Sequence, residues 1–334
     1  MSNNIPVMIA GIGMYLPEKV VTNDDLATFL DTSDEWIYTR TGIKERRVVT
    51  GKENSVDLGV NAAKIALANA NINPEEIDVI IVATSIPANL YPSSGCEIQS
   101  RIGAKNAFAF DVSAACSGFI YALSIASSYI RSGAYKNILI IATDSNSKFV
   151  DWKDRSSCVL FGDGAGAMVL KPSSDGVDDI LSLSINSDGN LGHLITLPLS
   201  GENCPLVAPD EQKPLKIRMI GKEVYKFVVS TLPLYIEKCI EKAGLKASDI
   251  DYLIPHQANV RIIDAMKDRL GYEKEKVIIN IEHCGNTSAA SVPIAMYEGI
   301  KEGKIKLPSK AILCGFGAGM TLGACIVNLR KEIM

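Results

Sequence analysis

Three side chains suited to covalent catalysis occur in three similar sequence settings. Cys116 stands in the run 110–119, where the end of a buried strand turns sharply into a helix. His256 ends a short apolar run, and Asn286 lies in a glycine-containing turn before a stretch of small residues. Open α/β sheets place their chemistry at the loops that follow strand ends. A thiol nucleophile, an imidazole and an amide at three such junctions therefore predict one active site.

The position of Cys116 predicts an activated thiol. The helix expected over residues 117–132 ends at Gly133 as a C-terminal cap. Its positive end points at the sulfur, so the thiol should lose its proton more readily than a free cysteine. A buried structural cysteine is the competing interpretation of this residue taken alone.

The two partner residues also have structural interpretations. His256 is otherwise a helix-capping or core histidine, and Asn286 a turn or N-cap residue, a role that is compatible with catalysis. His193 and His283 have no comparable setting, and we expect surface or local hydrogen-bonding roles for them.

The elements that must position these residues are repeated along the chain. Residues 73–81 resemble residues 246–254 at an offset of 173, and a second match farther along has an offset of 170. An offset of 170 places Cys116 and Asn286 at equivalent positions. Ordered matches at nearly constant spacing predict two copies of one structural unit. We place these halves at 1–175, carrying Cys116, and 176–334, carrying the histidine and asparagine.

Strands and helices are expected to alternate, which predicts an α/β fold. We expect a short helix from residue 23, a long amphipathic helix over 55–70, and strands over 7–13, 79–83, 107–112, 137–142, 158–170 and 317–329. Residues 184–216 are rich in Pro, Gly, Asn and Asp, and are expected to connect the halves and contribute to a cover over the site.

Composition excludes several classes of protein. The 334 residues carry a net charge of −4, which gives no basic footprint for nucleic acid. No apolar stretch reaches the roughly 20 residues that a membrane helix needs. The eight cysteines are scattered and form no C-x-x-C pair, which favours a cytoplasmic protein with free thiols and no metal over a disulfide framework or a zinc site.

The chain resembles the β-ketoacyl-acyl carrier protein synthase III family, the initiating condensing enzymes of bacterial fatty acid synthesis, in the thiolase-like superfamily. The resemblance covers essentially the whole length and rests on Asp34-Glu35-Trp36-Ile37 with Thr39-Arg40-Thr41-Gly42-Ile43, the Cys116 turn, His256-Gln257-Ala258-Asn259-x-Arg261, Gly285-Asn286-Thr287-Ser288-Ala289-Ala290, and Gly315-Phe316-Gly317-Ala318-Gly319. It implies a thiolase-like five-layer αβαβα fold with mixed sheets, and a homodimer.

The resemblance also implies a mechanism. Cys116 takes the acyl group of an acyl-CoA, commonly acetyl-CoA, and malonyl-acyl carrier protein then loses carbon dioxide and attacks the acyl-cysteine. His256 and Asn286 donate hydrogen bonds to the malonyl thioester oxygen, where negative charge builds. The backbone N–H groups of Cys116 and Ala318 hold the acyl oxyanion. CoA and the carrier's phosphopantetheine are substrates, so no resident cofactor is expected.

Binding residues follow from the same resemblance. Trp36 and Arg155 are expected to sandwich the CoA adenine, Arg40 to contact its phosphates, and Gly221, Asn259 and Phe316 to line the substrate tunnel. Gln257, Arg261 and Lys226 are expected to bind the acidic carrier protein. Tyr91 is expected to close the acyl pocket across the dimer, and its large ring favours an acetyl starter.

Other functions remain open at this level. A specialised synthase-III-like acyltransferase of a secondary-metabolite pathway would keep the same three residues and accept a different nucleophile. Papain-like proteases share the Cys-His-Asn order, but their Cys-Gly-x-Cys-Trp signature is absent. Plant-type polyketide synthases are usually longer. A redox-sensing scaffold would leave His256 and Asn286 unexplained.

Overall fold

The computed structural model describes residues 4–199, 204, 206 and 215–334. Its strands are β1 (Val7–Tyr15), β2 (Lys19–Thr22), β3 (Glu45–Val48), β4 (Val79–Ala83), β5 (Phe108–Val112), β6 (Ile138–Ser145), β7 (Asp163–Pro172), β8 (Ile180–Ser187), β9 (Ile195–Thr196), β10 (Arg218–Met219), β11 (Tyr252–Pro255), β12 (Ser309–Gly317) and β13 (Thr321–Leu329). Its α-helices are α1 (Asn23–Ala27), α2 (Asp34–Thr41), α3 (Ser55–Ala70), α4 (Ser94–Ile102), α5 (Gly118–Arg131), α6 (Gly221–Lys242), α7 (Val260–Leu270), α8 (Ile281–Cys284) and α9 (Ser291–Lys301).

Two mixed sheets form the framework. The first has the strand order β1-β7-β6-β4-β5, and the second has the order β11-β12-β13-β8. In the first, β4 is parallel to β5 and β6, and β7 is antiparallel to β6 and β1. In the second, β11 is parallel to β12, and β13 is antiparallel to β12 and β8. The second sheet thus repeats the pairing of β4, β6, β7 and β1.

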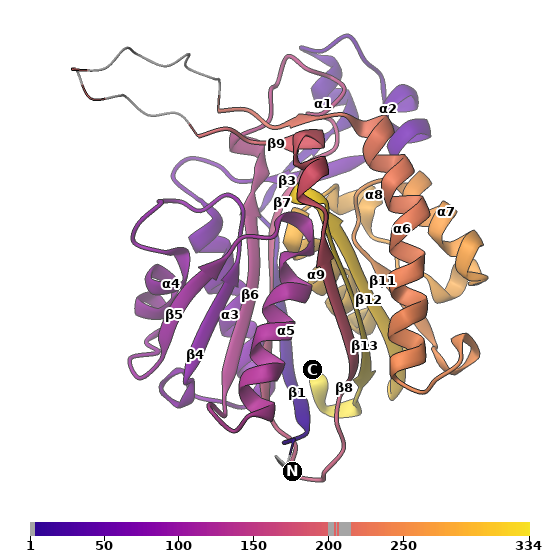
Figure 1. Ribbon diagram of the computed structural model, residues 1–334. Helices are drawn as coiled ribbons and strands as arrows, with labels where there is room; N and C mark the ends of the chain where they lie inside the picture. The colour runs from indigo at the N-terminus through magenta and orange to yellow at the C-terminus, as the bar shows by residue number, and fades with distance from the viewer. Residues whose placement is uncertain (1–3, 200–203, 205, 207–214) are drawn as a thin grey trace.

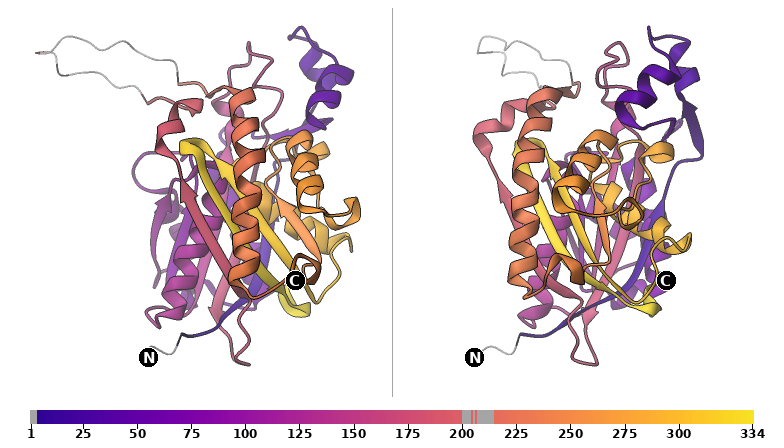
Figure 2. Two further views of the ribbon diagram at one scale, coloured as in Figure 1. Left: turned by 45° about the vertical axis from the view of Figure 1, so that its right-hand side comes forward. Right: turned by 90° about the vertical axis from the view of Figure 1, so that its right-hand side faces the viewer.

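Helices cover both faces of each sheet (Figure 1). α3 and α4 pack on the outer face of the first sheet, and α6 and α7 cover the second, as Figure 2 also shows. α5 and α9 lie between the sheets, each in contact with strands of both. Their apolar side chains join the two sheets in one continuous buried core. This is the five-layer αβαβα arrangement that the sequence predicts.

Local signals explain why the predicted elements form where they do. The Asn54 side chain caps α3 by accepting the Val56 N–H at 2.8 Å, and the Asp57 carboxylate in turn accepts the Asn54 N–H. The expected helix over 55–70 and strand over 79–83 are confirmed. The last strand of each half begins later than expected, at Asp163 and at Thr321, because the chain first makes irregular turns at the end of the sheets.

The repeat is in register up to the helices between the sheets. Ala115 and Ser288, 173 residues apart, share a left-handed backbone with φ of 46° and 54°. Each opens a short 3-10 turn, η2 (Ala115–Ser117) and η7 (Ser288–Ala290), that leads into a middle helix. α5 has 14 residues and α9 has 11, so the offset falls to 170 only afterwards.

The equivalent of Cys116 is therefore Ala289. The prediction that Cys116 and Asn286 occupy equivalent positions is wrong, because the offset of 170 applies only beyond the middle helices. The predicted boundary at 175/176 falls in the connection between β7 and β8.

The described part of the chain contains no helix with the length and apolar character required to cross a membrane. All eight cysteines are free, as expected from their spacing.

Candidate active site

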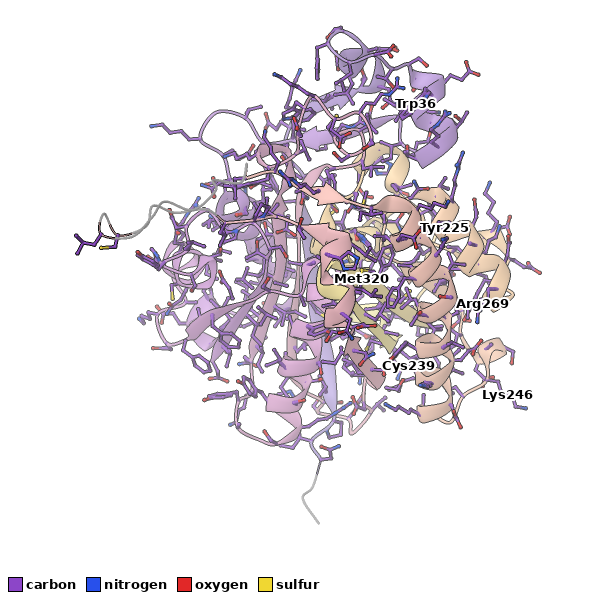
Figure 3. The ribbon with its side chains drawn as sticks, turned by 45° about the horizontal axis from the view of Figure 1, so that its top comes forward. Trp36, Tyr225, Cys239, Lys246, Arg269 and Met320 are labelled. Carbon is purple, nitrogen blue, oxygen red and sulfur yellow. The ribbon has the colours of Figure 1, made fainter. Side chains whose placement is uncertain are left out.

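The three predicted catalytic residues meet in one cavity. This cavity has a volume of about 420 Å³, and Cys116, His256 and Asn286 all line it. Trp36 of α2 and Tyr225 of α6 also line it, and Figure 3 labels both on the side of the molecule that it turns toward the viewer. The cavity wall is mainly apolar, so it favours the exclusion of water from an anionic intermediate.

Cys116 is the central residue of η2, directly before α5. Its sulfur lies 3.5 Å from the Ser288 hydroxyl of the opposite turn. Burial raises the pKa of the Cys116 thiol to about 12. The predicted fall in pKa is therefore not found, because the desolvation of a thiolate in this apolar cavity is the dominant effect.

His256 follows β11, and its ring is held from two sides. Its Nδ1 lies 2.6 Å from the Ser291 hydroxyl, which also accepts the Gln257 N–H at 3.3 Å. We assign the Ser291 hydroxyl as the donor to Nδ1, the tautomer in which the neutral ring carries its proton on Nε2. The Phe316 ring packs edge-on with centroids 5.1 Å apart. Burial lowers the pKa of His256 to about 3, so the ring is a neutral donor.

Asn286 is fixed by hydrogen bonds to two residues of the first half and to one neighbour along the chain. Its N–H donates to the Leu160 carbonyl at 2.8 Å, and its carbonyl accepts the Gly162 N–H at 3.0 Å. Its Oδ1 accepts the Ser288 N–H at 2.9 Å. Because Oδ1 is occupied, the amide presents Nδ2 as the group that remains to donate into the cavity.

The end of β12 leaves space beside the backbone N–H of Cys116. A Cβ on Gly317 would lie 2.5 Å from the Cys116 nitrogen, so any other residue would fill the space beside that N–H. Ala318 follows and lines the cavity, as expected for the second backbone donor. Glycine at 317 thus keeps an oxyanion-binding position open.

The predicted adenine site is closed by an arginine in this structure. The guanidinium of Arg155 lies 5.0 Å from the centre of the Trp36 ring, and that of Arg40 lies 4.5 Å from it. Arg155 also donates to the backbone carbonyl of Asp31 and to its carboxylate. A base stacked between two planar groups needs roughly 7 Å, so Arg155 must move before an adenine can enter.

The other predicted binding residues divide into three groups. Gly221, Asn259 and Phe316 line the cavity as predicted. Arg40, assigned to the CoA phosphates, and Arg261, assigned to the carrier protein, line it too. Lys226 is exposed on α6 and pairs with Glu223 at 3.1 Å. Tyr91 is 87% exposed and does not line the cavity of its own chain.

The prediction that Gln257 binds the carrier protein is wrong. Gln257 is fully buried, and its amide nitrogen donates to the carbonyls of Pro255 and Ile278. Its Oε1 accepts the Asn280 N–H at 3.1 Å. It therefore supports the loop that carries His256 and does not reach the surface.

Two site features lay beyond the sequence prediction. Ser288 lies next to Cys116, and the charge of the buried Asp144 adds to the rise in the pKa of the Cys116 thiol. The only sequence signal for Asp144 was its place at the end of a buried strand. The expected cover is partly described, since Ile195, Thr196 and Leu197 line the cavity. The rest of that expected segment, 200–203, 205 and 207–214, lies outside the described residues.

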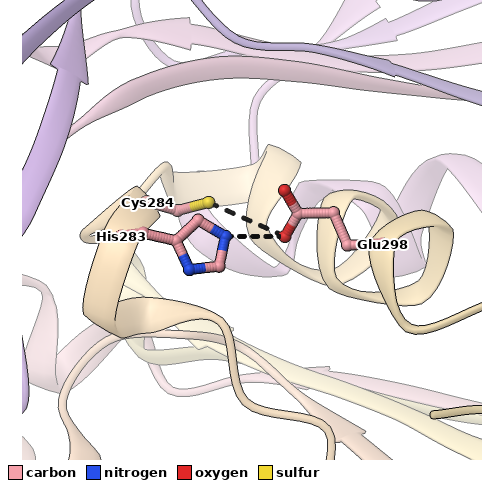
Figure 4. Close-up of side chains that lie close together, drawn as sticks. All are labelled: His283, Cys284 and Glu298. Carbon is pink, nitrogen blue, oxygen red and sulfur yellow. Dashed lines mark hydrogen bonds and ion pairs between the residues drawn. The ribbon is translucent and has the colours of Figure 1, made fainter. Parts of the chain in front are cut away.

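The other two histidines make local contacts, as expected. His193 Nδ1 lies 3.3 Å from the Asn190 carbonyl. His283 Nε2 lies 3.1 Å from Glu298 Oε2, and the Cys284 thiol approaches the same oxygen (Figure 4). Asn280 also donates to this oxygen at 2.7 Å. Glu298 thus serves as a shared acceptor for three donors.

Comparison with known proteins agrees with this geometry. The family model for 3-oxoacyl-(acyl-carrier-protein) synthase III matches residues 110–189, and the model for its C-terminal part matches residues 240–329. A β-ketoacyl-(acyl-carrier-protein) synthase III of Aquifex aeolicus is 49% identical over 96% of this chain and 98% of its own length. One of Clostridium acetobutylicum is 46% identical over 97% and 99%.

Solved structures give the same result. The crystal structure of the Aquifex aeolicus synthase III superposes with a TM-score of 0.90 at 47% identity, covering 97% of this chain and 100% of that one. The priming β-ketosynthase of the R1128 polyketide pathway superposes with a TM-score of 0.91 at 35% identity, covering 99% and 98%. The full-length agreement includes every element that brings the cysteine, histidine and asparagine together. The chain therefore belongs to the 3-oxoacyl-(acyl-carrier-protein) synthase III family.

Proposed function

We propose that this protein catalyses the decarboxylating condensation of an acyl-CoA with malonyl-acyl carrier protein, through an acyl-cysteine, to start fatty acid synthesis. The observation that carries the proposal is the convergence of Cys116, His256 and Asn286 on one apolar cavity. Each of the three is buried or half-buried and held by contacts that leave a reactive atom for the cavity. Family membership supports the same reaction.

In the first half-reaction, the Cys116 thiolate attacks the thioester carbonyl of the acyl-CoA. The Cys116 N–H, left open by Gly317, and the backbone at Ala318 stabilise the oxyanion. The CoA thiolate then leaves, and the acyl group stays on the sulfur.

In the second half-reaction, malonyl-acyl carrier protein loses carbon dioxide. Negative charge builds on the malonyl thioester oxygen, and the Nε2–H of His256 and the Nδ2–H of Asn286 stabilise it. A neutral histidine suits this role, because a donor that keeps its proton does not quench the carbanion. The carbanion then attacks the acyl-cysteine and releases the β-ketoacyl carrier protein.

The mouth of the cavity suits both substrates. We place the CoA adenine on Trp36 after Arg155 moves away, with Arg40 at the phosphates. Arg261, in the first turn of α7, lines the cavity and donates to the Thr39 carbonyl at 3.0 Å. We place the acidic carrier protein against Arg261 and near Lys226.

We also propose a homodimer, formed through the edge of the first sheet. β5 is the last strand of that sheet, and Phe108 on it is 42% exposed and stacks with Phe110. An apolar edge strand is a surface suited to strand pairing. In such a dimer the exposed Tyr91 is the residue we assign to the partner's acyl pocket, which favours acetyl over longer acyl groups. The free cysteines agree with a cytoplasmic location.

Acylation and carbon dioxide release test this function directly. Incubation with acetyl-CoA should add one acetyl mass to the peptide of Cys116, and malonyl-acyl carrier protein should then release carbon dioxide and discharge it. Acyl transfer without carbon dioxide release would instead favour the specialised acyltransferase, and no adduct would reject both. A comparison of acetyl-CoA with octanoyl-CoA tests the starter, since faster turnover of octanoyl would contradict the acetyl assignment.

A further inference from the structure

A group of potential metal ligands lies on α8 and α9, the two helices that flank the Asn286 turn in the chain. His283 Nε2, Cys284 Sγ and a carboxylate oxygen of Glu298 all lie within 4.8 Å of one another (Figure 4). Nε2 is 3.1 Å from Glu298 Oε2, and Sγ is 3.9 Å from the same oxygen. Ligands that share a tetrahedral zinc ion, at bonds of about 2.0–2.3 Å, are about 3.3–3.8 Å apart. Small side-chain movements would therefore bring these three atoms onto one ion.

Asn280 adds a fourth side chain at the same place. Its amide nitrogen lies 2.7 Å from Glu298 Oε2 and 3.5 Å from Cys284 Sγ. The residue is only 5% exposed, and its Oδ1 has no hydrogen-bond partner among the described residues. A buried acceptor without a partner is rare and calls for an explanation. The two ends of an amide have nearly the same shape, so a half-turn exchanges them and aims Oδ1 at the other ligands.

The charges of these groups balance those of a divalent cation. In the metal-free protein, Asn280, His283 and Cys284 share Glu298 as their acceptor, as described above. When a metal binds, the Cys284 S–H proton leaves to solvent as the sulfur–metal bond forms. His283 binds through an unprotonated Nε2, and its neutral ring carries a proton on Nδ1. One thiolate and one carboxylate then cancel two positive charges, and a neutral site is compatible with the burial of Cys284.

An ion can reach this group from solution. The His283 side chain is 39% exposed, whereas Cys284 is buried. Two basic side chains act on the group electrostatically, Arg47 on the thiol and Lys304 on the imidazole. Lys304 pairs with Glu302 at 2.8 Å, which offsets its charge. The group is therefore open at the imidazole and only partly opposed by positive charge.

We propose that this group binds a thiophilic divalent cation of the zinc class. Its ligands are Asn280, His283, Cys284 and Glu298. Thiolate and imidazole ligands favour zinc-class ions, whereas Mg²⁺ and Ca²⁺ prefer sites built from oxygen atoms. Four protein ligands fill a tetrahedral shell, so the ion has a structural role and no open position for chemistry. No C-x-x-C pair marks the site in the sequence, because one cysteine is its only thiol. The site goes beyond the proposed function and does not depend on it.

The position of the site gives a bound ion a defined effect. Cys284 lies two residues before Asn286, and the Asn280 N–H donates to Gln257 Oε1, which supports the loop of His256. An ion would therefore tie α8 to α9 next to the segments that carry both hydrogen-bond donors of the cavity. Its four ligands do not line the cavity. We expect the ion to stabilise this region without contact with a substrate.

The test measures metal binding by the full chain after a chelator has removed any metal. Zn²⁺ is titrated against a chromophoric chelator, and Co²⁺ serves as a second probe, because a cobalt–thiolate bond gives a charge-transfer band in the near ultraviolet. We expect one tight ion per chain, the cobalt–thiolate band, and a higher melting temperature with Zn²⁺. Cys284→Ser and Glu298→Gln should each weaken Zn²⁺ binding at least about 100-fold, because even an outer-shell partner is typically worth about 10- to 100-fold.

Controls separate this site from binding elsewhere on the chain. Cys116 and His256 line one cavity and offer a thiol and an imidazole of their own, so the titration is repeated in Cys116→Ala, which should bind Zn²⁺ as tightly as the parent. His193→Gln and Cys96→Ser remove an exposed imidazole and an exposed thiol, and both should also bind like the parent. An excess of Mg²⁺ should not displace Co²⁺.

The possible outcomes are distinct. The absence of a tight ion in the parent would overturn the site, as would an unchanged Zn²⁺ affinity in Cys284→Ser and Glu298→Gln or a lost affinity in Cys116→Ala. Far-ultraviolet circular dichroism checks that each variant is folded. If the variants at the two more buried ligands unfold, His283→Gln, at a half-exposed side chain, gives the same comparison. Tight Zn²⁺ binding by a protein that takes no acyl group from any acyl-CoA would support the site and reject the proposed function.

Discussion

The two halves of this protein build the same turn and use it differently. η2 in the first half and η7 in the second each begin with a residue in the left-handed region, Ala115 and Ser288. The central residue is Cys116 in one and Ala289 in the other. Non-glycine residues with positive φ cost free energy, so both halves keep a strained turn of which only one carries a nucleophile. The strained turn is therefore a feature of the repeated fold, and only the first half has a thiol in it.

The residues that face each turn differ in the same systematic way. The β4–β6 and β11–β12 registers agree at an offset of 173, which makes Asp144 the equivalent of Gly317. Gly317 leaves the Cys116 N–H open to substrate, whereas the equivalent position in the first half carries the fully buried carboxyl side chain of Asp144.

The catalytic histidine also differs from the residue at the equivalent position of the first half. His256 is the equivalent of Ala83, and Ser291 is the equivalent of Gly118. In the first half these positions pack closely without a polar contact, since a Cβ added to Gly118 would lie 3.1 Å from the Ala83 Cβ, tighter than an ordinary van der Waals contact. In the second half they form the hydrogen bond that fixes the imidazole. The two halves thus share one backbone arrangement, and the second half carries the side chains that donate hydrogen bonds into the cavity.

Removal of the nucleophile should have the largest effect, because the first half would lose acyl transfer while the second half keeps its hydrogen-bond donors. Cys116→Ala should abolish acetyl transfer, because no other residue at the first turn can hold the acyl group. Carbon dioxide release from malonyl-acyl carrier protein should persist, since the donors belong to the second half. The measurements are mass spectrometry of the acylated protein and radiolabelled carbon dioxide capture. Loss of both activities in a folded variant would contradict a division of labour between the halves.

The converse variant tests the second half. Asn286→Ala should lower decarboxylation by about 10²- to 10³-fold, the usual cost of one donor to a developing oxyanion. Acetylation of Cys116 should change only a few-fold. A parallel loss of acetylation would show instead that Asn286 mainly positions Ser288, whose N–H its Oδ1 accepts at 2.9 Å.

A smaller effect is expected from closing the space beside the first turn. Gly317→Ala would place a methyl group 2.5 Å from the Cys116 nitrogen, so the backbone must shift. We expect acetyl transfer to fall by at least tenfold, and overpacking to cost about 1–3 kcal/mol of the free energy of unfolding. Gly189→Ala, in open space, is the control for both measurements. Full acetyl transfer by Gly317→Ala would remove the Cys116 N–H from the oxyanion site.

The sequence predicted the repeated framework from ordered internal matches and the family resemblance, and it placed Cys116, His256 and Asn286 in one site, which agrees with the cavity that they share. The sequence predictions were wrong where the burial of a side chain determines its pKa or its contacts. The thiol of Cys116 was expected to be acidic from its place at a helix start, but desolvation is the larger effect. Gln257 was assigned to the surface from its motif, yet its amide supports a buried loop. The misplaced equivalence of Asn286 came from a three-residue difference between α5 and α9, which sequence matches at their ends cannot locate.

The segments that enter the two turns also differ, and this difference gives the smallest predicted effect. β5 leads to the first turn, whereas α8 leads to the second and carries His283 against Glu298 of α9. Glu298 raises the pKa of His283, and His283 lowers that of Glu298. A raised histidine pKa stabilises the fold below the unfolded value and loses this effect as pH rises through the folded value.

The pair should therefore stabilise the protein most between the unfolded pKa values of the two groups, near 4.5 and 6.5, and its contribution should fade above that window. His283 is 39% exposed, so screening limits the effect to about 1 kcal/mol or less. In the metal-free protein, Glu298→Gln should lower the melting temperature more at about pH 6 than at about pH 8, because His283 loses its charge as the pH rises. His193→Gln, at a histidine whose Nδ1 lies 3.3 Å from the Asn190 carbonyl, should leave both values unchanged. An equal loss at both pH values would mean that Glu298 stabilises the entry to the second turn through Asn280, by hydrogen bonding and not by charge.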